Sequence, residues 1–361
     1  MEKKFYMVEI NLLETLKDAV EKKASDIFIV VGLALSMKVK GEIIPVSDGI
    51  LMPDDTSKII REIYGLAKNP NLDNFIKTGD DDFSMTIPNV GRFRVNTYRQ
   101  RSSLAAVLRI IPFGLPDPYA YGIPPAVIEL HKQTKGLILV TGPAGSGKST
   151  TLACIIDSIN ANRKGHIMTL EDPIEFLHRH KKSIVSQREI PSDTASYLQA
   201  LKSALRQSPD VILIGEMRDI ETISIALTAA ETGHLMLSTL HTMGAANTID
   251  RIIDIFPASQ QQQVRVQLSM TLQAVVSQQI LPTVDKDRAA AFEIMLNTTA
   301  VSNMIREGKL HQINSTIQTS GSLGMQTMDS SLVSLVRKGV ITKETAIIYS
   351  ANPEIVTRLL G

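Results

Sequence analysis

A short apolar run that leads directly into a glycine-rich loop is the feature that most constrains the fold of this chain. Residues 136–140 are Gly-Leu-Ile-Leu-Val, and residues 141–150 are Thr-Gly-Pro-Ala-Gly-Ser-Gly-Lys-Ser-Thr. The spacing of apolar residues predicts a helix over 150–159. A strand, a glycine loop and a helix in this order are the context in which the G-x-x-x-x-G-K-[ST] pattern marks a phosphate-binding loop, or P-loop.

The residue types of this loop suit a nucleoside triphosphate. Glycines let the backbone wrap a phosphate with its N–H groups pointing inward, and the helix N-terminus adds a positive dipole end. Lys148 can reach the β and γ phosphates, and the Ser149 hydroxyl can ligate Mg²⁺. We therefore expect ATP and Mg²⁺ as ligands, and these nucleotide-binding residues: Gly142, Pro143, Ala144, Gly145, Ser146, Gly147, Lys148, Ser149 and Thr150.

The composition indicates a globular protein without a basic surface field. The 361 residues suggest roughly two domains, and 43% of them are hydrophobic. Lys and Arg total 38 against 37 Asp and Glu, so nothing indicates the general attraction that drives nucleic-acid binding. An aromatic content of 4% without tryptophan offers little for stacking on bases. We expect no nucleic-acid partner.

The cysteine count and the hydropathy pattern favour the cytoplasm. Cys154 is the only cysteine, so no intrachain disulfide and no zinc cluster can form, and we expect it to be a small buried residue. The chain starts without a secretory signal, and its most apolar run, 27–37, is too short to span a bilayer. Any association with the inner face of the cytoplasmic membrane is expected to depend on partners.

Two domains joined by a proline-rich linker are predicted. Residues 1–112 combine a helix at 12–23 with strand-like runs, which indicates an α+β domain. Five prolines and two glycines lie between residues 112 and 125, and we assign 113–124 as the linker. Over 125–361, strands alternate with helices, which predicts an α/β domain with a parallel sheet and a helical C-terminal portion. The glutamines of 260–263 are expected on a polar helix face.

Acidic residues follow two of the predicted strands. Glu171 and Asp172 come after the strand at 166–170, and the carboxyl ends of parallel strands are where ligands bind. They are candidates for holding Mg²⁺ or orienting water, with a solvated turn as the alternative. P-loop enzymes ordinarily carry aspartate at the end of the strand that corresponds to 211–214. Here Gly215 stands at that point and Glu216 follows, so Glu216 is the first candidate for activating water, with Glu171 as the second.

Two histidines flank the predicted strand at 235–238. His234 and His241 are seven residues apart, which rules out the adjacent ligand pair of a helical zinc site. We expect one of them to sense the γ phosphate, although either could instead be structural.

Four motifs stand in a fixed order and together resemble the Walker A, Asp box, atypical Walker B and His box of the secretion and pilus ATPases. They are Gly142–Ser149, Thr169–Glu175, Leu205–Asp219 and Ala229–Thr242. Within that superfamily the chain is similar to the type IV pilus retraction motors of the PilT type, through Ile305–Ile313 and Gly324–Asp329. The four-cysteine zinc module common in assembly and secretion motors is absent from the sequence. Thr299 and Ser302 stand where the retraction motif usually has proline and arginine, and Phe28 where many members have histidine.

The resemblance implies a homohexameric ring with a PAS-like N-terminal domain, a RecA-like C-terminal domain and nucleotide between the two. It also implies that N-terminal arginines complete the site. The matching segments contain Arg94 and Arg109, with Arg99 and Arg101 as second choices and a salt-bridged strand face as the alternative. A cation that faces the γ phosphate would stabilise the charge of phosphoryl transfer.

The implied function is an Mg²⁺-dependent ATPase motor that powers pilus retraction and twitching motility. It would act on the pilin fibre indirectly, through an inner-membrane platform protein. An accessory retraction motor or an assembly or secretion motor of the same superfamily is the close alternative. A RecA-like nucleic-acid translocase and a nucleotide-dependent switch with negligible turnover are the alternatives from other classes.

Overall fold

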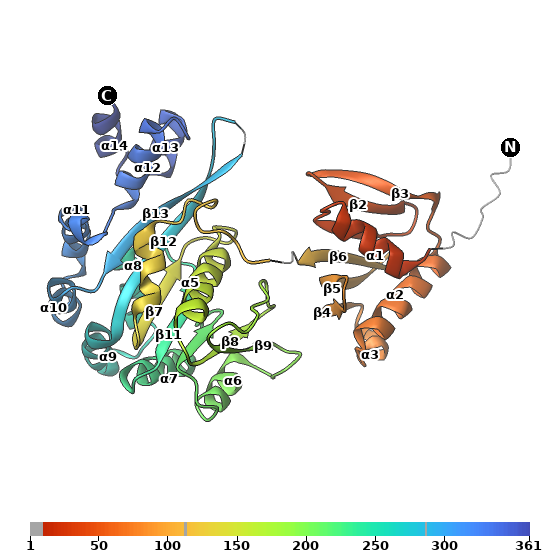
Figure 1. Ribbon diagram of the computed structural model, residues 1–361, viewed down its shortest axis with the longest axis horizontal. Helices are drawn as coiled ribbons and strands as arrows, with labels where there is room; N and C mark the ends of the chain where they lie inside the picture. The colour runs from red at the N-terminus through yellow and green to blue at the C-terminus, as the bar shows by residue number, and fades with distance from the viewer. Residues whose placement is uncertain (1–9, 112–113, 286) are drawn as a thin grey trace. The chain divides into compact units, whose positions relative to one another are not determined.

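The structure is a computed structural model that describes residues 10–111, 114–285 and 287–361. The chain divides into two units with the boundary between Gly114 and Leu115, and each unit is described by itself (Figure 1). The expected junction between the first domain and the linker, at 112–113, lies outside the described residues. Residues 115–124 are grouped with the second unit, where Cys154 is buried and its Sγ donates to the Pro116 carbonyl.

The first unit is built on an antiparallel sheet of six strands, in the order β3-β2-β1-β6-β5-β4. Its elements are α1 (Leu12–Glu21), β1 (Asp26–Ile29), β2 (Ala34–Val39), β3 (Glu42–Ile50), α2 (Pro53–Ala67), α3 (Leu72–Thr78), β4 (Asp80–Ile87), β5 (Gly91–Gln100) and β6 (Ser103–Ile111). The α+β expectation for this part of the chain is confirmed.

Alternation along the strands separates a core face from a polar face in this unit. Ile27 and Ile29 of β1 pack in one hydrophobic cluster with Leu12 and Leu16 of α1 and with the buried face of α2. Side chains at alternate positions point to the opposite face. Asp26 pairs in register with Arg109, and Arg109 pairs with Arg94, so these three residues form a row across that second face.

The second unit contains a sheet of seven strands in the order β13-β12-β7-β11-β10-β8-β9. All neighbouring pairs are parallel except β12 with β13. The strands are β7 (Gly136–Thr141), β8 (His166–Glu171), β9 (Ile184–Glu189), β10 (Val211–Ile214), β11 (Leu235–Leu240), β12 (Leu272–Pro282) and β13 (Arg288–Leu296). The helices are α4 (Pro125–Ile128), α5 (Lys148–Asn162), α6 (Tyr197–Ala204), α7 (Ile220–Glu231), α8 (Ala245–Asp254), α9 (Ala258–Thr271), α10 (Thr299–Glu307), α11 (Ile313–Thr319), α12 (Met328–Arg337), α13 (Lys343–Tyr349) and α14 (Pro353–Leu360), with 3₁₀ turns at Glu129–Lys132, Leu310–Gln312 and Gly321–Leu323.

Helices cover both faces of this sheet, which explains why β7, β10 and β11 are buried at every position. Along β7, Leu137 and Leu139 join the cluster that includes α6 to α11, whereas Ile138 and Val140 join the cluster formed with α4 and α5. Strands buried on both faces are typical of parallel sheets in α/β proteins. The predicted parallel-sheet domain is therefore confirmed, and 260–263 lies on α9 as expected.

The C-terminal signature segments have structural roles in this unit. Ile305 and Ile313 are buried in the main core, and Gly308 ends α10 in the left-handed conformation. Asp329 accepts hydrogen bonds from the Ala351 and Asn352 backbone N–H groups, which fixes the turn between α13 and α14. Ser302, which stands where the retraction motif usually has arginine, donates its hydroxyl to the Ser269 carbonyl at 2.6 Å. This hydrogen bond holds α10 against α9.

Within the described residues, every helix falls short of the length and hydropathy that crossing a bilayer requires.

Candidate nucleotide-binding site

Parallel pairing brings the sequence motifs to one edge of the second sheet. The strands β7, β8, β10 and β11 end at Thr141, Glu171, Ile214 and Leu240, and the P-loop, the acidic residues and His241 follow these ends. They line one cavity of about 430 Å³. The predicted residues that line it are Ala144, Gly145, Ser146, Gly147, Lys148, Ser149, Thr150, Glu171, Asp172, Glu216 and His241. His234 instead precedes β11, at the other end of that strand, where its Nδ1 lies 3.1 Å from the Ala229 carbonyl oxygen.

The P-loop needs glycine at the positions where the motif has it. Gly145 and Gly147 have φ angles of 75° and 83°, a conformation that residues with a Cβ adopt at a cost. At Gly142 a Cβ would lie 2.2 Å from the Gln278 carbonyl oxygen, because β12 runs against the start of the loop. The loop is thus shaped by its own backbone and by a neighbouring strand.

Lys148 directs its charge back onto the loop. Its Nζ donates to the carbonyl oxygens of Gly142 and Pro143, both at 2.9 Å. Burial lowers the pKa of the ammonium group, while the carboxylates of Glu175 and Glu216 act in the opposite direction. A buried cation held by neutral carbonyls is well placed to meet an anion.

The residues present fit a bound phosphate. The hydroxyl oxygens of Thr141 and Ser146 are buried without a hydrogen-bond partner in the structure, although buried hydroxyls are usually paired. Ser146 lines the cavity, and the Ser149 hydroxyl faces it as well. Among the described residues no group of three or more His, Cys, Asp or Glu side chains could hold a metal by itself. Mg²⁺ at this edge would therefore need oxygen ligands from the nucleotide and water besides the Ser149 hydroxyl.

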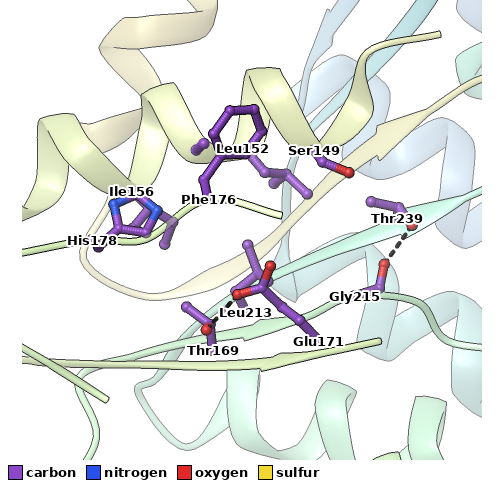
Figure 2. Close-up of a pocket in the computed structure, with 11 residues that line it drawn as sticks. Ser149, Leu152, Ile156, Thr169, Glu171, Phe176, His178, Leu213, Gly215 and Thr239 are labelled. Atoms are coloured by element: carbon purple, nitrogen blue, oxygen red, sulfur yellow. Dashed lines mark hydrogen bonds between the residues drawn. The ribbon is translucent and has the colours of Figure 1, made fainter. Parts of the chain in front are cut away.

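Glu171 lies in a small pocket beneath α5. Figure 2 shows its side chain on the sheet side, opposite Leu152 and Ile156 of the helix. The Thr169 hydroxyl donates to Glu171 Oε1 at 2.6 Å, and Gln187 Nε2 donates to the same oxygen at 3.3 Å. Burial raises the pKa of Glu171 to about 7 despite these hydrogen bonds.

Gln187 also fixes the loop that follows Glu171. Its Nε2 donates to the Phe176 carbonyl at 2.8 Å, and its Oε1 accepts the His178 backbone N–H at 2.8 Å. A single amide on β9 thereby holds the candidate carboxylate and the chain that leads away from it. No local sequence pattern marked this residue, because β9 itself was not predicted.

Glu216 is flanked by two basic side chains. Arg218 Nε lies 2.7 Å from Glu216 Oε2, and His241 Nε2 lies 3.7 Å from the same oxygen. The Glu216 side chain is 18% exposed, whereas that of Arg218 is 76% exposed. The carboxylate therefore lies at the cavity wall, paired with a cation that is mostly exposed to solvent.

Tyr197 explains why the end of β10 carries glycine in place of an acidic residue. A Cβ at Gly215 would lie 2.7 Å from the Tyr197 hydroxyl oxygen and 3.3 Å from the Leu170 carbonyl oxygen. The Gly215 carbonyl accepts the Thr239 hydroxyl at 2.5 Å, as Figure 2 shows. An aspartate cannot fit at this point while Tyr197 stays in place, so the carboxylate stands one residue later.

The candidate arginines belong to the first unit, where aspartates hold them. Arg94 Nη2 lies 2.7 Å from Asp82 Oδ2, and Arg109 Nε lies 3.0 Å from Asp26 Oδ1. Of the second choices, Arg99 donates to the Ile76 carbonyl, and Arg101 follows β5 in a left-handed conformation. Their roles toward a nucleotide stay a prediction.

The family described as "Type II/IV secretion system protein" matches residues 1–346 of this sequence. The chain belongs to that family. The type IV pilus retraction ATPase PilT of Pseudomonas aeruginosa is 45% identical over 96% of this chain and 99% of its own length. A twitching motility protein of Neisseria gonorrhoeae is 53% identical over 76% of this chain and 73% of its own.

Solved structures agree with this membership. A crystal structure of the pilus retraction motor PilT with bound ADP has a TM-score of 0.90 and 46% identity, and the match covers 97% of this chain and all of that one. The resemblance to secretion and pilus ATPases of the PilT type is therefore confirmed, and so is the expectation of an ATP-hydrolysing enzyme.

The contact between Gly215 and Tyr197 can be tested by a double-mutant cycle. Gly215→Ala should lower the free energy of unfolding by about 1–3 kcal/mol, the usual effect of overpacking. Tyr197→Phe removes the hydroxyl that the new methyl would meet, so Gly215→Ala should cost much less in that background. Denaturant unfolding of the four proteins measures the coupling. Equal losses in both backgrounds would exclude the steric explanation.

Proposed function

We propose that this ATPase is a hexameric motor that powers type IV pilus retraction. The observation that carries the proposal is the convergence of the P-loop, Glu171, Asp172, Glu216 and His241 on one cavity of a chain that matches PilT over nearly its full length. A cavity lined by phosphate-binding backbone and by carboxylates supports hydrolysis rather than binding alone.

Each residue of the cavity has a task in this proposal. ATP supplies the transferable phosphoryl group, and Mg²⁺ neutralises part of its charge. Lys148 gives up its two carbonyl partners to hold the phosphates, and the Ser149 hydroxyl holds the metal. Glu216 accepts a proton from the attacking water, while Glu171 and Asp172 support water or metal. His241, beside Glu216, senses the γ phosphate.

Arg94 and Arg109 supply further positive charge in this proposal. They are neighbours in register on one face of the first sheet, and each has an aspartate partner that it would release. The Arg94–Asp82 pair is about 40% exposed on both sides, and exposed ion pairs contribute only about 0–1 kcal/mol, so exchanging this carboxylate for a phosphate is energetically accessible. Asp26 is largely buried, but it also accepts the Ser25 hydroxyl and so keeps a hydrogen-bond partner when Arg109 leaves.

The partners and location also belong to the proposal. We infer a homohexamer in the cytoplasm, held at the inner face of the membrane through a pilus platform protein and acting on the pilin fibre indirectly. The even charge balance argues against nucleic acid as the moved polymer. The family of this chain also contains proteins named for secretion, so an accessory, assembly or secretion motor is the alternative.

Lys148→Ala should abolish ATP hydrolysis, because a methyl group cannot replace an ammonium group beside the triphosphate. A strain that carries only this variant should keep more surface pili than the wild type and lose twitching. Steady-state phosphate release and electron-microscopic pilus counts measure the two effects. Wild-type turnover would refute the P-loop assignment, and fewer pili would indicate an assembly motor instead.

Glu216→Gln should retain ATP binding while hydrolysis slows by at least ~10²-fold, since the amide keeps the shape but cannot accept a proton. Glu171→Gln is the matched control for a carboxylate at the neighbouring strand end. Binding of a fluorescent ATP analogue and single-turnover hydrolysis separate affinity from chemistry. Normal hydrolysis by Glu216→Gln together with a slow Glu171→Gln variant would move the base to Glu171.

Arg94→Ala and Arg109→Ala should each slow hydrolysis at least ~10²-fold, the low end for removing one positioned donor that stabilises the charge of the transition state. Arg61→Ala is the control, because Arg61 is an exposed residue of α2 and is not one of the candidate arginines. Turnover under saturating ATP, with circular dichroism as the folding check, decides the matter. Folded variants with full activity would leave both arginines as members of a salt-bridged sheet face.

A further inference from the structure

Gln278 of β12 holds the P-loop through a buried side-chain amide. Gln278 is 1% exposed. Gln278 Nε2 donates to the Ser146 carbonyl, and Gln278 Oε1 accepts the Thr151 hydroxyl at 2.8 Å. Thr151 lies in the first turn of α5, so one amide bridges the P-loop and the helix that follows it.

The orientation of this amide is determined by its partners. The Ser146 carbonyl can only accept a hydrogen bond, so it must face the NH₂ group of Gln278 rather than the oxygen. The oxygen is then left for the Thr151 hydroxyl, which can donate. Both polar ends of the side chain are satisfied in this orientation and in no other.

The hydrogen bond to Ser146 sets the direction of the next N–H group. In a trans peptide the C=O and the following N–H point in opposite directions. Because the Ser146 carbonyl is held toward Gln278, the N–H of Gly147 must point away from β12. Gly147 lines the cavity, and outward-pointing backbone N–H groups are what a P-loop offers to a phosphate.

The backbone of β12 adds a second restraint at the start of the loop. The Gln278 carbonyl oxygen occupies the space that a Cβ of Gly142 would need, and Ser277 pairs in register with Thr141. β12 therefore contacts the loop at Gly142 through its backbone and at Ser146 through the Gln278 side chain. A glycine-rich loop has many accessible conformations, so such restraints reduce the entropy lost when it binds an anion.

We propose that Gln278 is a positioning residue that presents the Gly147 N–H to the phosphates of a nucleoside di- or triphosphate. The inference rests on the proposed P-loop site and goes beyond it, because it assigns the conformation of the loop to Gln278, which lies 132 positions from Ser146 in the sequence and outside the lining of the cavity. The alternative is a purely structural role, in which the buried amide of Gln278 stabilises the fold without affecting nucleotide affinity.

The adjacent residue provides a matched control. Gln279 is the same residue type on the same strand, but its side chain lies on the opposite face, where Nε2 donates to the Tyr349 carbonyl at 3.3 Å. Replacing either glutamine removes one amide from the same strand of the second unit. Only Gln278 contacts the P-loop through the hydrogen bonds described here.

The test compares full-length Gln278→Met and Gln279→Met with the wild type. Methionine keeps the approximate volume but has no N–H to donate. Gln278→Met should raise the Kd for Mg²⁺-ADP about 10-fold or more, because the Ser146 carbonyl loses its buried donor and the peptide is free to turn. Gln279→Met should change that Kd less than about twofold. The rise in Tm on adding ADP should shrink only for Gln278→Met, a readout that uses each variant as its own reference.

A wild-type Kd and a wild-type ADP-induced rise in Tm for Gln278→Met would overturn the inference. If that variant does not fold, Thr151→Val decides, since it removes the hydroxyl that orients the amide; it should raise the Kd about threefold, and an unchanged Kd would also overturn the inference. A wrong P-loop assignment gives a different result from a wrong role for Gln278, because Lys148→Ala would then retain hydrolysis. Loss of hydrolysis in Lys148→Ala together with normal ADP binding by Gln278→Met would remove only the role of Gln278.

Discussion

The strands β7, β11, β10 and β8 pair in parallel, so their carboxyl ends must lie along one edge of the sheet. Every group of the candidate site depends on this pairing. The P-loop, Glu171, Glu216 and His241 come from four separate chain segments and would have no reason to meet without it. Burial between two layers of helices stabilises the pairing.

Space at this edge decides which residues carry the chemistry. Tyr197 fills the position beside Gly215 where an acidic side chain would otherwise project, and the carboxylate stands on Glu216 instead. At that point it meets Arg218 and His241, both on the cavity wall. Glycine at position 215 therefore matches the space that Tyr197, the first residue of α6, leaves at the end of β10.

Two side-chain amides support the site, that of Gln278 buried and that of Gln187 partly buried. Gln187 holds Glu171 and its following loop, and Gln278 holds the Ser146 peptide and the first turn of α5. An amide offers both a donor and an acceptor without a charge, so it can be buried at lower cost than a carboxylate or an ammonium group. These supports leave the charged residues, Lys148 and Glu216, at the cavity surface where an anionic ligand would meet them.

The P-loop, the carboxylates after two strands and most strands of both sheets could be predicted from the sequence, because each depends on consecutive residues whose periodicity or spacing is local. The sequence also indicated Glu216, one residue after Gly215, as the candidate carboxylate, but it could not show that Tyr197 crowds position 215. The places of β9, β12 and β13 in the second sheet, and the contacts of Gln187, Tyr197 and Gln278 at the site, became visible only in the folded chain. The side chains of these three residues act across long chain separations, and isolated glutamine or tyrosine residues carry no local pattern. The physical reason is that hydrogen bonds and steric limits depend on which segments the sheet brings together, and that is set by pairing and burial rather than by neighbours in the chain.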